Sequence, residues 1–147
     1  MNEKVIEKLK NPDFFKELVI MSDESKVKEA FKSSGIEISN DDLNDIKEFI
    51  NVVLESSSKL SEEDLKEISG GYRGGIVNRL SAKLVDATTE DAKENVVELT
   101  SWTAIHSDQI VEGLLATAIA GISIGGTLGV QKLIKTGKEK GWWSKKK

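Results

Sequence analysis

Short apolar stretches at helical spacing alternate with helix-start signals through the first half of the chain. The segment 11–13, Asn-Pro-Asp, suits a helix start, because Asn caps the first turn, Pro fits the first position and Asp faces the positive helix end. Gly35 is expected to end a later helix, and Ser39 with Asp42 resembles a capping box. The apolar stripes of the predicted helices are Val5, Ile6 and Leu9; Phe14, Phe15, Leu18 and Val19; Val27, Ala30 and Phe31; and Leu43, Ile46, Phe49, Ile50, Val53 and Leu54.

The pattern changes after this region. A serine run over residues 56–58 is expected to be a short linker, and Ser61 with Asp64 can cap one more short helix. Two glycines, Gly70 and Gly71, are expected to stop that helix and to leave a flexible backbone without side chains. Further on, the sequence predicts helices over 76–85 and from about 88 to 104, and one long Gly/Ala-rich hydrophobic helix over about 110–134. No strand alternation is present, so the predicted fold class is all-α.

Charge separates the same two regions. Residues 1–71 contain 10 Lys/Arg and 17 Asp/Glu, whereas residues 72–147 contain 11 and 8, so the formal net charge of −4 hides an acidic part and a basic part. The chain has no cysteine, which excludes a disulfide framework, a cysteine nucleophile and thioether rings. Its first residues lack an early apolar core, so no ordinary secretory signal is expected. Two segments with different physical roles are therefore predicted, 1–71 and 72–147.

The boundary between the two segments has the features of a protease site. A narrow groove around a scissile bond admits only residues without side chains, and apolar side chains upstream then supply affinity. Leu60, Leu65 and Ile68 stand eleven, six and three residues before Gly71. The neighbouring pair at 74–75 lacks this arrangement, because two of its three corresponding upstream positions are polar. We therefore expect cleavage after Gly71 and a product that begins at Tyr72.

This pattern resembles the double-glycine leader of bacteriocins and related secreted peptides, whose usual form is L-S-x-x-E-L-x-x-I-x-G-G. The chain agrees at every fixed position except one, where Asp64 replaces Glu. Residues 4–49 resemble a Nif11-type leader more loosely, through the N-P-D turn and the segment 35–43, Gly-Ile-Glu-Ile-Ser-Asn-Asp-Asp-Leu. The two resemblances cover residues 4–71 and leave 72–147 unassigned.

The resemblance implies a precursor that is cytoplasmic until a peptidase-containing ABC transporter removes the leader and secretes the product. Leu60, Leu65 and Ile68 would then be recognition residues for the protease and transporter, and Gly70, Gly71 and Tyr72 would form the cleavage site. In many such precursors the leader also binds a modifying enzyme. An enzymatic activity of the chain itself is not expected.

The hydrophobic part of the product carries a ridge of small residues. Small residues stand four positions apart within 19 residues that have no formal charge: Gly113, Thr117, Gly121, Gly125 and Gly129. As one helix this run would be about 28 Å long, close to the thickness of a bilayer core. Such a ridge lets helices approach closely in lipid, although a buried helix in a soluble bundle can have the same pattern. The sequence leaves both readings open.

The tail after this run is basic and aromatic. Residues 132–147 contain seven lysines and one glutamate, together with Trp142 and Trp143. Lysines suit anionic head groups and tryptophans suit the membrane interface, so a target membrane is the expected partner. No folded basic face is evident that would predict nucleic-acid binding.

Other candidate chemistry is weak. The run at 106–108, His-Ser-Asp, contains the letters of a hydrolase triad, but a triad is defined by geometry and not by neighbouring positions. His106 is the sole histidine, so a His-rich metal site is impossible, and no metal or cofactor is expected.

The leading hypothesis is a precursor of a bacteriocin-like, membrane-active peptide. One alternative is a modified ribosomal peptide, in which Thr88, Thr89 or Thr100 could be dehydrated before export. Another is a small helical interaction protein that is never cut.

Overall fold

The computed structural model describes residues 3–58, 62–63, 82, 90, 94, 99–102, 104, 111–122 and 126–143. Every element within these ranges is an α-helix, which confirms the predicted fold class. The segment from 64 to 81, and with it the predicted Gly-Gly linker, lies outside the described residues.

Four helices form the N-terminal part, and their local start signals work as the sequence predicts. They are α1 (Glu3–Leu9), α2 (Pro12–Ile20), α3 (Glu24–Lys32) and α4 (Asn40–Ser57). The Asn11 side chain accepts a hydrogen bond from the N–H of Phe14 at 3.1 Å, which caps α2. Ser39 and Asp42 form the reciprocal capping box of α4, since each backbone N–H donates to the other's side chain at 3.1 Å.

A helix cap before α3 and a glycine turn after it complete this part. Asp23 caps α3 by accepting from the N–H of Lys26 at 2.9 Å. Gly35 has a φ of +79°, the left-handed conformation that favours glycine, and it ends the turn after α3 as expected.

The prediction of a linker at residues 56–58 is wrong. Helix α4 continues through Ser57, and the N–H of Ser58 still donates to the carbonyl of Leu54 at 3.0 Å. Ser57 is buried, because it follows Val53 and Leu54 by one helical turn on the side that faces the core.

The prediction of one long hydrophobic helix over about 110–134 is also wrong. The chain forms two helices there, α8 (Val111–Ile122) and α9 (Gly126–Lys140). A 12-residue helix such as α8 is about 18 Å long, well short of the roughly 30 Å of a bilayer core. None of the helices that the structure describes has the length and apolar content needed to span a membrane.

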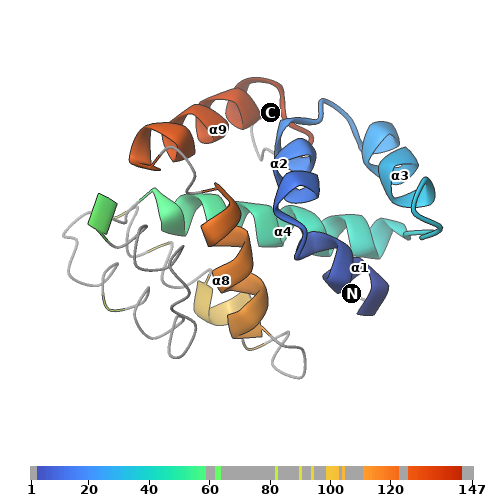
Figure 1. Cartoon of the computed structure of the whole chain (residues 1–147), viewed down its shortest axis with the longest axis horizontal. Helices are drawn as coiled ribbons and strands as arrows, with labels where there is room; N and C mark the ends of the chain where they lie inside the picture. Colours follow the sequence, from blue (N-terminus) through green and yellow to red (C-terminus); the bar gives the residue numbers. More distant parts are fainter. Residues whose placement is uncertain are drawn as a thin grey trace.

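All six of these helices share one hydrophobic core. Helix α8 packs against α1, α2 and α4, and α9 packs against α2, α4 and α8. Figure 1 shows α4 running across the middle of the molecule, with α8 crossing it and α9 above it beside α2. The core side chains therefore come from both predicted segments, including Phe15, Phe49 and Leu54 from the first and Ile119, Val130 and Trp143 from the second.

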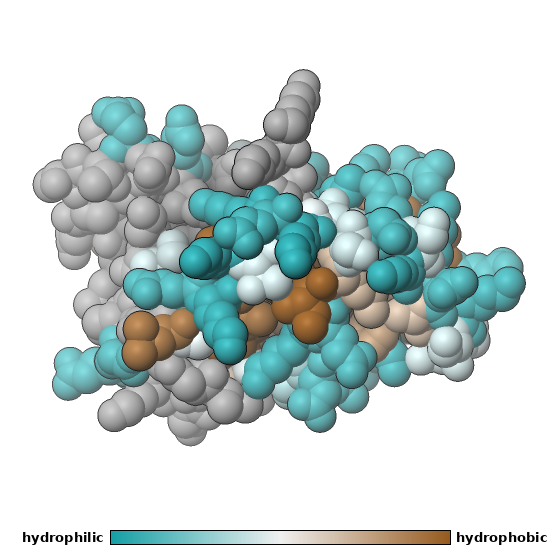
Figure 2. All heavy atoms as spheres, turned by 90° about the horizontal axis from the view of Figure 1, so that it is seen from above, coloured by the Kyte–Doolittle hydropathy of each residue, from teal (hydrophilic) through white to brown (hydrophobic). Residues whose placement is uncertain are grey.

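The surface above this core is mainly polar. On the face shown in Figure 2, hydrophilic residues predominate among the described atoms, and hydrophobic residues are exposed in small areas. Among described residues, Ile20 and Leu128 are the large hydrophobic side chains that are mostly exposed. The apolar faces of the described helices are therefore largely buried against other parts of the chain.

Candidate functional site

The C-terminal end of helix α2 is completed by residues from the other end of the chain. The last carbonyls of any helix have no partner within that helix, and α2 ends on an extended Met21 rather than on a glycine cap. The indole N–H of Trp142 donates to the Leu18 carbonyl at 2.9 Å, and that of Trp143 donates to the Val19 carbonyl at 2.7 Å. The Val19 carbonyl thereby gains a partner 124 positions away in sequence, and the Leu18 carbonyl, which also accepts from the N–H of Met21 at 3.3 Å, gains a second donor.

A third bond fixes the backbone at the same place. The N–H of Trp142 donates to the Met21 carbonyl at 3.0 Å. Both indole rings are buried, with 6% of Trp142 and 1% of Trp143 exposed. We call Trp142 and Trp143, with the α2 carbonyls that they contact, the tryptophan clasp.

Two glycines of the basic tail make room for the clasp. A Cβ atom on Gly137 would overlap the six-membered ring of Trp143 and lie 2.7 Å from its Nε1. A Cβ atom on Gly141 would lie 2.8 Å from Trp143 Nε1 and 2.8 Å from Gly137 Cα. Real Cβ atoms essentially never approach so closely, so the indole can lie back against α9 only because both positions lack side chains.

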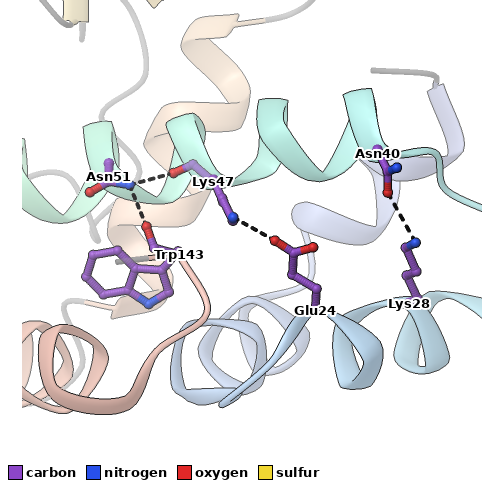
Figure 3. Close-up of polar contacts among 6 residues, drawn as sticks. All are labelled: Glu24, Lys28, Asn40, Lys47, Asn51 and Trp143. Carbon is purple, nitrogen blue, oxygen red and sulfur yellow. Dashed lines mark hydrogen bonds and ion pairs between the residues drawn. The ribbon is translucent and has the colours of Figure 1, made fainter. Parts of the chain in front are cut away.

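Helix α4 also contacts the clasp, and the close-up in Figure 3 shows its residues Lys47 and Asn51 beside Trp143. The buried Asn51 side chain donates to the Trp143 carbonyl at 3.0 Å and to the Lys47 carbonyl at 2.9 Å. The Lys47 ammonium lies 5.9 Å from the Trp142 ring centre and 2.7 Å from a carboxylate oxygen of Glu24. The clasp therefore contacts α2 and α4 together, and α3 reaches it through Glu24.

A second contact between the two segments lies on α8. Gly121 is buried where α8 meets the start of α2, and a Cβ atom there would lie 3.0 Å from Pro12 Cβ. Leu114, Ala118, Ile119 and Ile122 of the same helix are all buried. Gly121 thus acts as a small residue at a close helix contact, but the partner in this chain is the N-terminal segment.

The remaining predicted ridge does not lie along one helix. Gly113 belongs to α8 and Gly129 to α9, while Gly125 lies outside the described residues. Trp142 and Trp143 are core residues of the intact chain, so their predicted membrane role can concern only a separated product. The predicted cleavage and recognition residues, Leu60, Leu65, Ile68, Gly70, Gly71 and Tyr72, lie outside the described residues, as does His106.

Sequence reasoning missed Asn51, Gly137 and Gly141. A signal for the glycines was present in the segment 137–143, Gly-Lys-Glu-Lys-Gly-Trp-Trp, in which two glycines one helical turn apart precede two large aromatic residues. Asn51 stands on the apolar stripe of α4, where a polar residue needs a partner.

The described residues show no catalytic arrangement. Two shallow depressions, of about 500 Å³ and 440 Å³, lie on either side of Ile36 and are lined mainly by charged surface side chains. No group of His, Asp and Glu within the described ranges could hold a metal ion. Comparison with models of protein families, with curated proteins and with solved structures finds no match to the chain.

Proposed function

We propose that the chain is a precursor from which a peptidase-containing ABC transporter removes residues 1–71 and exports residues 72–147 as a membrane-active peptide. The chain itself is not an enzyme under this proposal. The observation that carries it is the spacing of Leu60, Leu65 and Ile68 before the Gly70-Gly71 pair.

Two further features support this division of the chain. The formal charge changes sign near the same boundary, from an acidic first segment to a basic second one. The capping signals that resemble a Nif11-type leader, at Asn11 and at Ser39 with Asp42, form real helix caps. A folded helical segment ahead of the glycine pair is compatible with a leader that binds a transporter or a modifying enzyme.

The product would act on membranes through its basic and aromatic end. Lys132, Lys135 and Lys140 are exposed along α9. They would meet anionic head groups, and Trp142 and Trp143 would enter the interface once they leave the core. Insertion as a single spanning helix is not part of this proposal, because α8 and α9 are separate.

The shared hydrophobic core favours a second candidate, a helical interaction protein that is never cut. The ring of Phe49 on α4 packs against that of Trp102 at a tilt of 36°, with ring centres 5.1 Å apart, and this is one of the contacts that join the two segments. A chain whose two halves complete each other can be a finished product by itself.

Incubation of the full chain with a double-glycine peptidase domain tests the two candidates. The precursor proposal expects a product whose N-terminal residue is Tyr72, measured by mass spectrometry. Gly71→Leu should abolish cutting, because a side chain cannot enter the narrow groove, while the matched control Gly74→Leu should be cut normally. Cutting of Gly71→Leu at the wild-type rate, or an intact chain as the sole form in culture, would favour the uncut protein.

A further inference from the structure

The contacts between the two segments resemble those of a protein interior rather than those of a tethered tail. The clasp buries two indole rings, and each of their N–H groups meets a carbonyl of α2. At the N-terminal end of the same helix α2, Gly121 brings α8 close to Pro12. Aromatic anchors in desolvated sites are the side chains that contribute most to binding at interfaces.

None of these contacts depends on the covalent link at Gly71. They join α1, α2 and α4, which lie before the glycine pair, to α8 and α9, which lie after it. Cutting one peptide bond in the connection removes none of the hydrogen bonds, the ring contacts or the buried area. The cut changes only the entropy of association. Two separate fragments lose translational and rotational freedom when they bind, and a covalent linker reduces that cost.

We infer that residues 3–58 form a binding surface for the released product, so that the two fragments remain together as a noncovalent complex after the chain is cut at Gly71. The occupant of this surface is the C-terminal segment 72–147 of the same chain. The inference rests on the proposed function for the position of the cut, while the association itself follows from the described contacts.

Charge complementarity supports this choice of occupant. The first segment is acidic and the second is basic, so the separated fragments attract each other before contact. The complex also keeps Trp142 and Trp143 covered, and the release of the product then requires a separate step that pulls the clasp apart. Cutting and activation are two events under this inference.

The test is to cut the full chain in solution with the peptidase domain and then to measure the mass of the main species by size-exclusion chromatography with light scattering. We expect both fragments to elute together at about the mass of the intact chain, 16.1 kDa, with unchanged helical circular dichroism. Separation of the fragments at micromolar concentration, or loss of the helical signal after cutting, would overturn the inference.

Two conservative variants test the clasp within that complex. Trp142→Phe and Trp143→Phe keep an aromatic ring but remove the N–H donor to Leu18 or Val19. Trp143→Phe should weaken the complex about tenfold, because the buried Val19 carbonyl loses its partner, and Trp142→Phe should weaken it less, because the Leu18 carbonyl keeps the N–H of Met21. The matched control is Leu128→Ala in α9, where the side chain is 76% exposed and the affinity should not change. Equal affinities for wild type and both tryptophan variants would refute the role of the clasp.

A failure of the proposed function is distinguishable from a failure of this inference. If the double-glycine peptidase does not cut the chain, the precursor proposal fails. A recognition sequence for an unrelated protease, inserted after Gly71, then yields the same two fragments, and their association is measured in the same way.

Discussion

Replacing Gly137 by alanine distinguishes helix propensity from the packing of the clasp. Helix propensity should make the protein more stable, whereas a clash with Trp143 should make it less stable. Alanine in a helix interior is favoured over glycine by about 1 kcal/mol, so helix propensity alone predicts a more stable protein. In the structure, however, the new methyl group would overlap the Trp143 ring, which is 1% exposed and held by its bond to Val19. The ring cannot move without losing that bond or its packing.

The magnitude follows from what the ring does. A shift that keeps the ring in the core resembles overpacking, which costs about 1–3 kcal/mol. Complete expulsion resembles truncation of a buried tryptophan, which costs about 3–5 kcal/mol. After the gain in helix propensity of about 1 kcal/mol is subtracted, Gly137→Ala should lower the free energy of unfolding by about 0–2 kcal/mol if the ring shifts within the core and by about 2–4 kcal/mol if it is expelled.

Urea unfolding followed by far-ultraviolet circular dichroism measures this change, and a double-mutant cycle assigns its cause. In a Trp143→Leu background the ring is absent, so Gly137→Ala should become neutral or stabilising. If Gly137→Ala stabilises the wild-type chain as helix propensity predicts, or if it destabilises both backgrounds equally, the Trp143 ring does not pack against Gly137 as described.

Three further outcomes test other parts of the structure. Gly121→Ala should change the free energy of unfolding by less than about 1 kcal/mol, since a shift of a few tenths of an ångström relieves Pro12, whereas Gly121→Leu should cost about 1–3 kcal/mol or more in urea unfolding. Ser39→Ala should cost about 1 kcal/mol through loss of the α4 cap, and the effect should shrink when Asp42→Ala is already present. Raising the ionic strength should slow the association of the cut fragments in stopped-flow fluorescence, because salt screens the attraction between the acidic and basic segments.

The sequence predicts the N-terminal helices well because their determinants are local. Asn11, Ser39 and Gly35 each act within a few residues of their own position, and the structure has the expected bond or backbone angle at each. The division of the apolar run into α8 and α9 also had a local signal, since residues 125 and 126 are adjacent glycines and such pairs mark turns. The length of the uncharged run favours a single helix, but α9 begins at the second glycine of this pair.

The clasp could not be predicted in the same way. Tryptophan next to lysine suits a membrane interface as well as a protein core, because an indole has an apolar body and one polar N–H group. What decides between them is the position of the last carbonyls of α2, each of which lies 124 positions away from the indole N–H that donates to it. Only the folded chain brings the donor and the acceptor together.

If the chain is a precursor as proposed, the order in which it is cut and the clasp opens has a measurable consequence for export. A transporter that must thread the product has to break the bonds at Leu18, Val19 and Met21, so the clasp opens before or after the cut at Gly71. Trp143→Phe removes the bond to the buried Val19 carbonyl, a loss of about 1.4 kcal/mol that raises the open population roughly tenfold. Processing in transporter-containing vesicles should therefore accelerate several-fold if opening comes first and stay unchanged if cutting comes first. An unchanged rate agrees with the inference that the fragments remain bound after the cut. A slower rate would contradict both opening before the cut and opening after it.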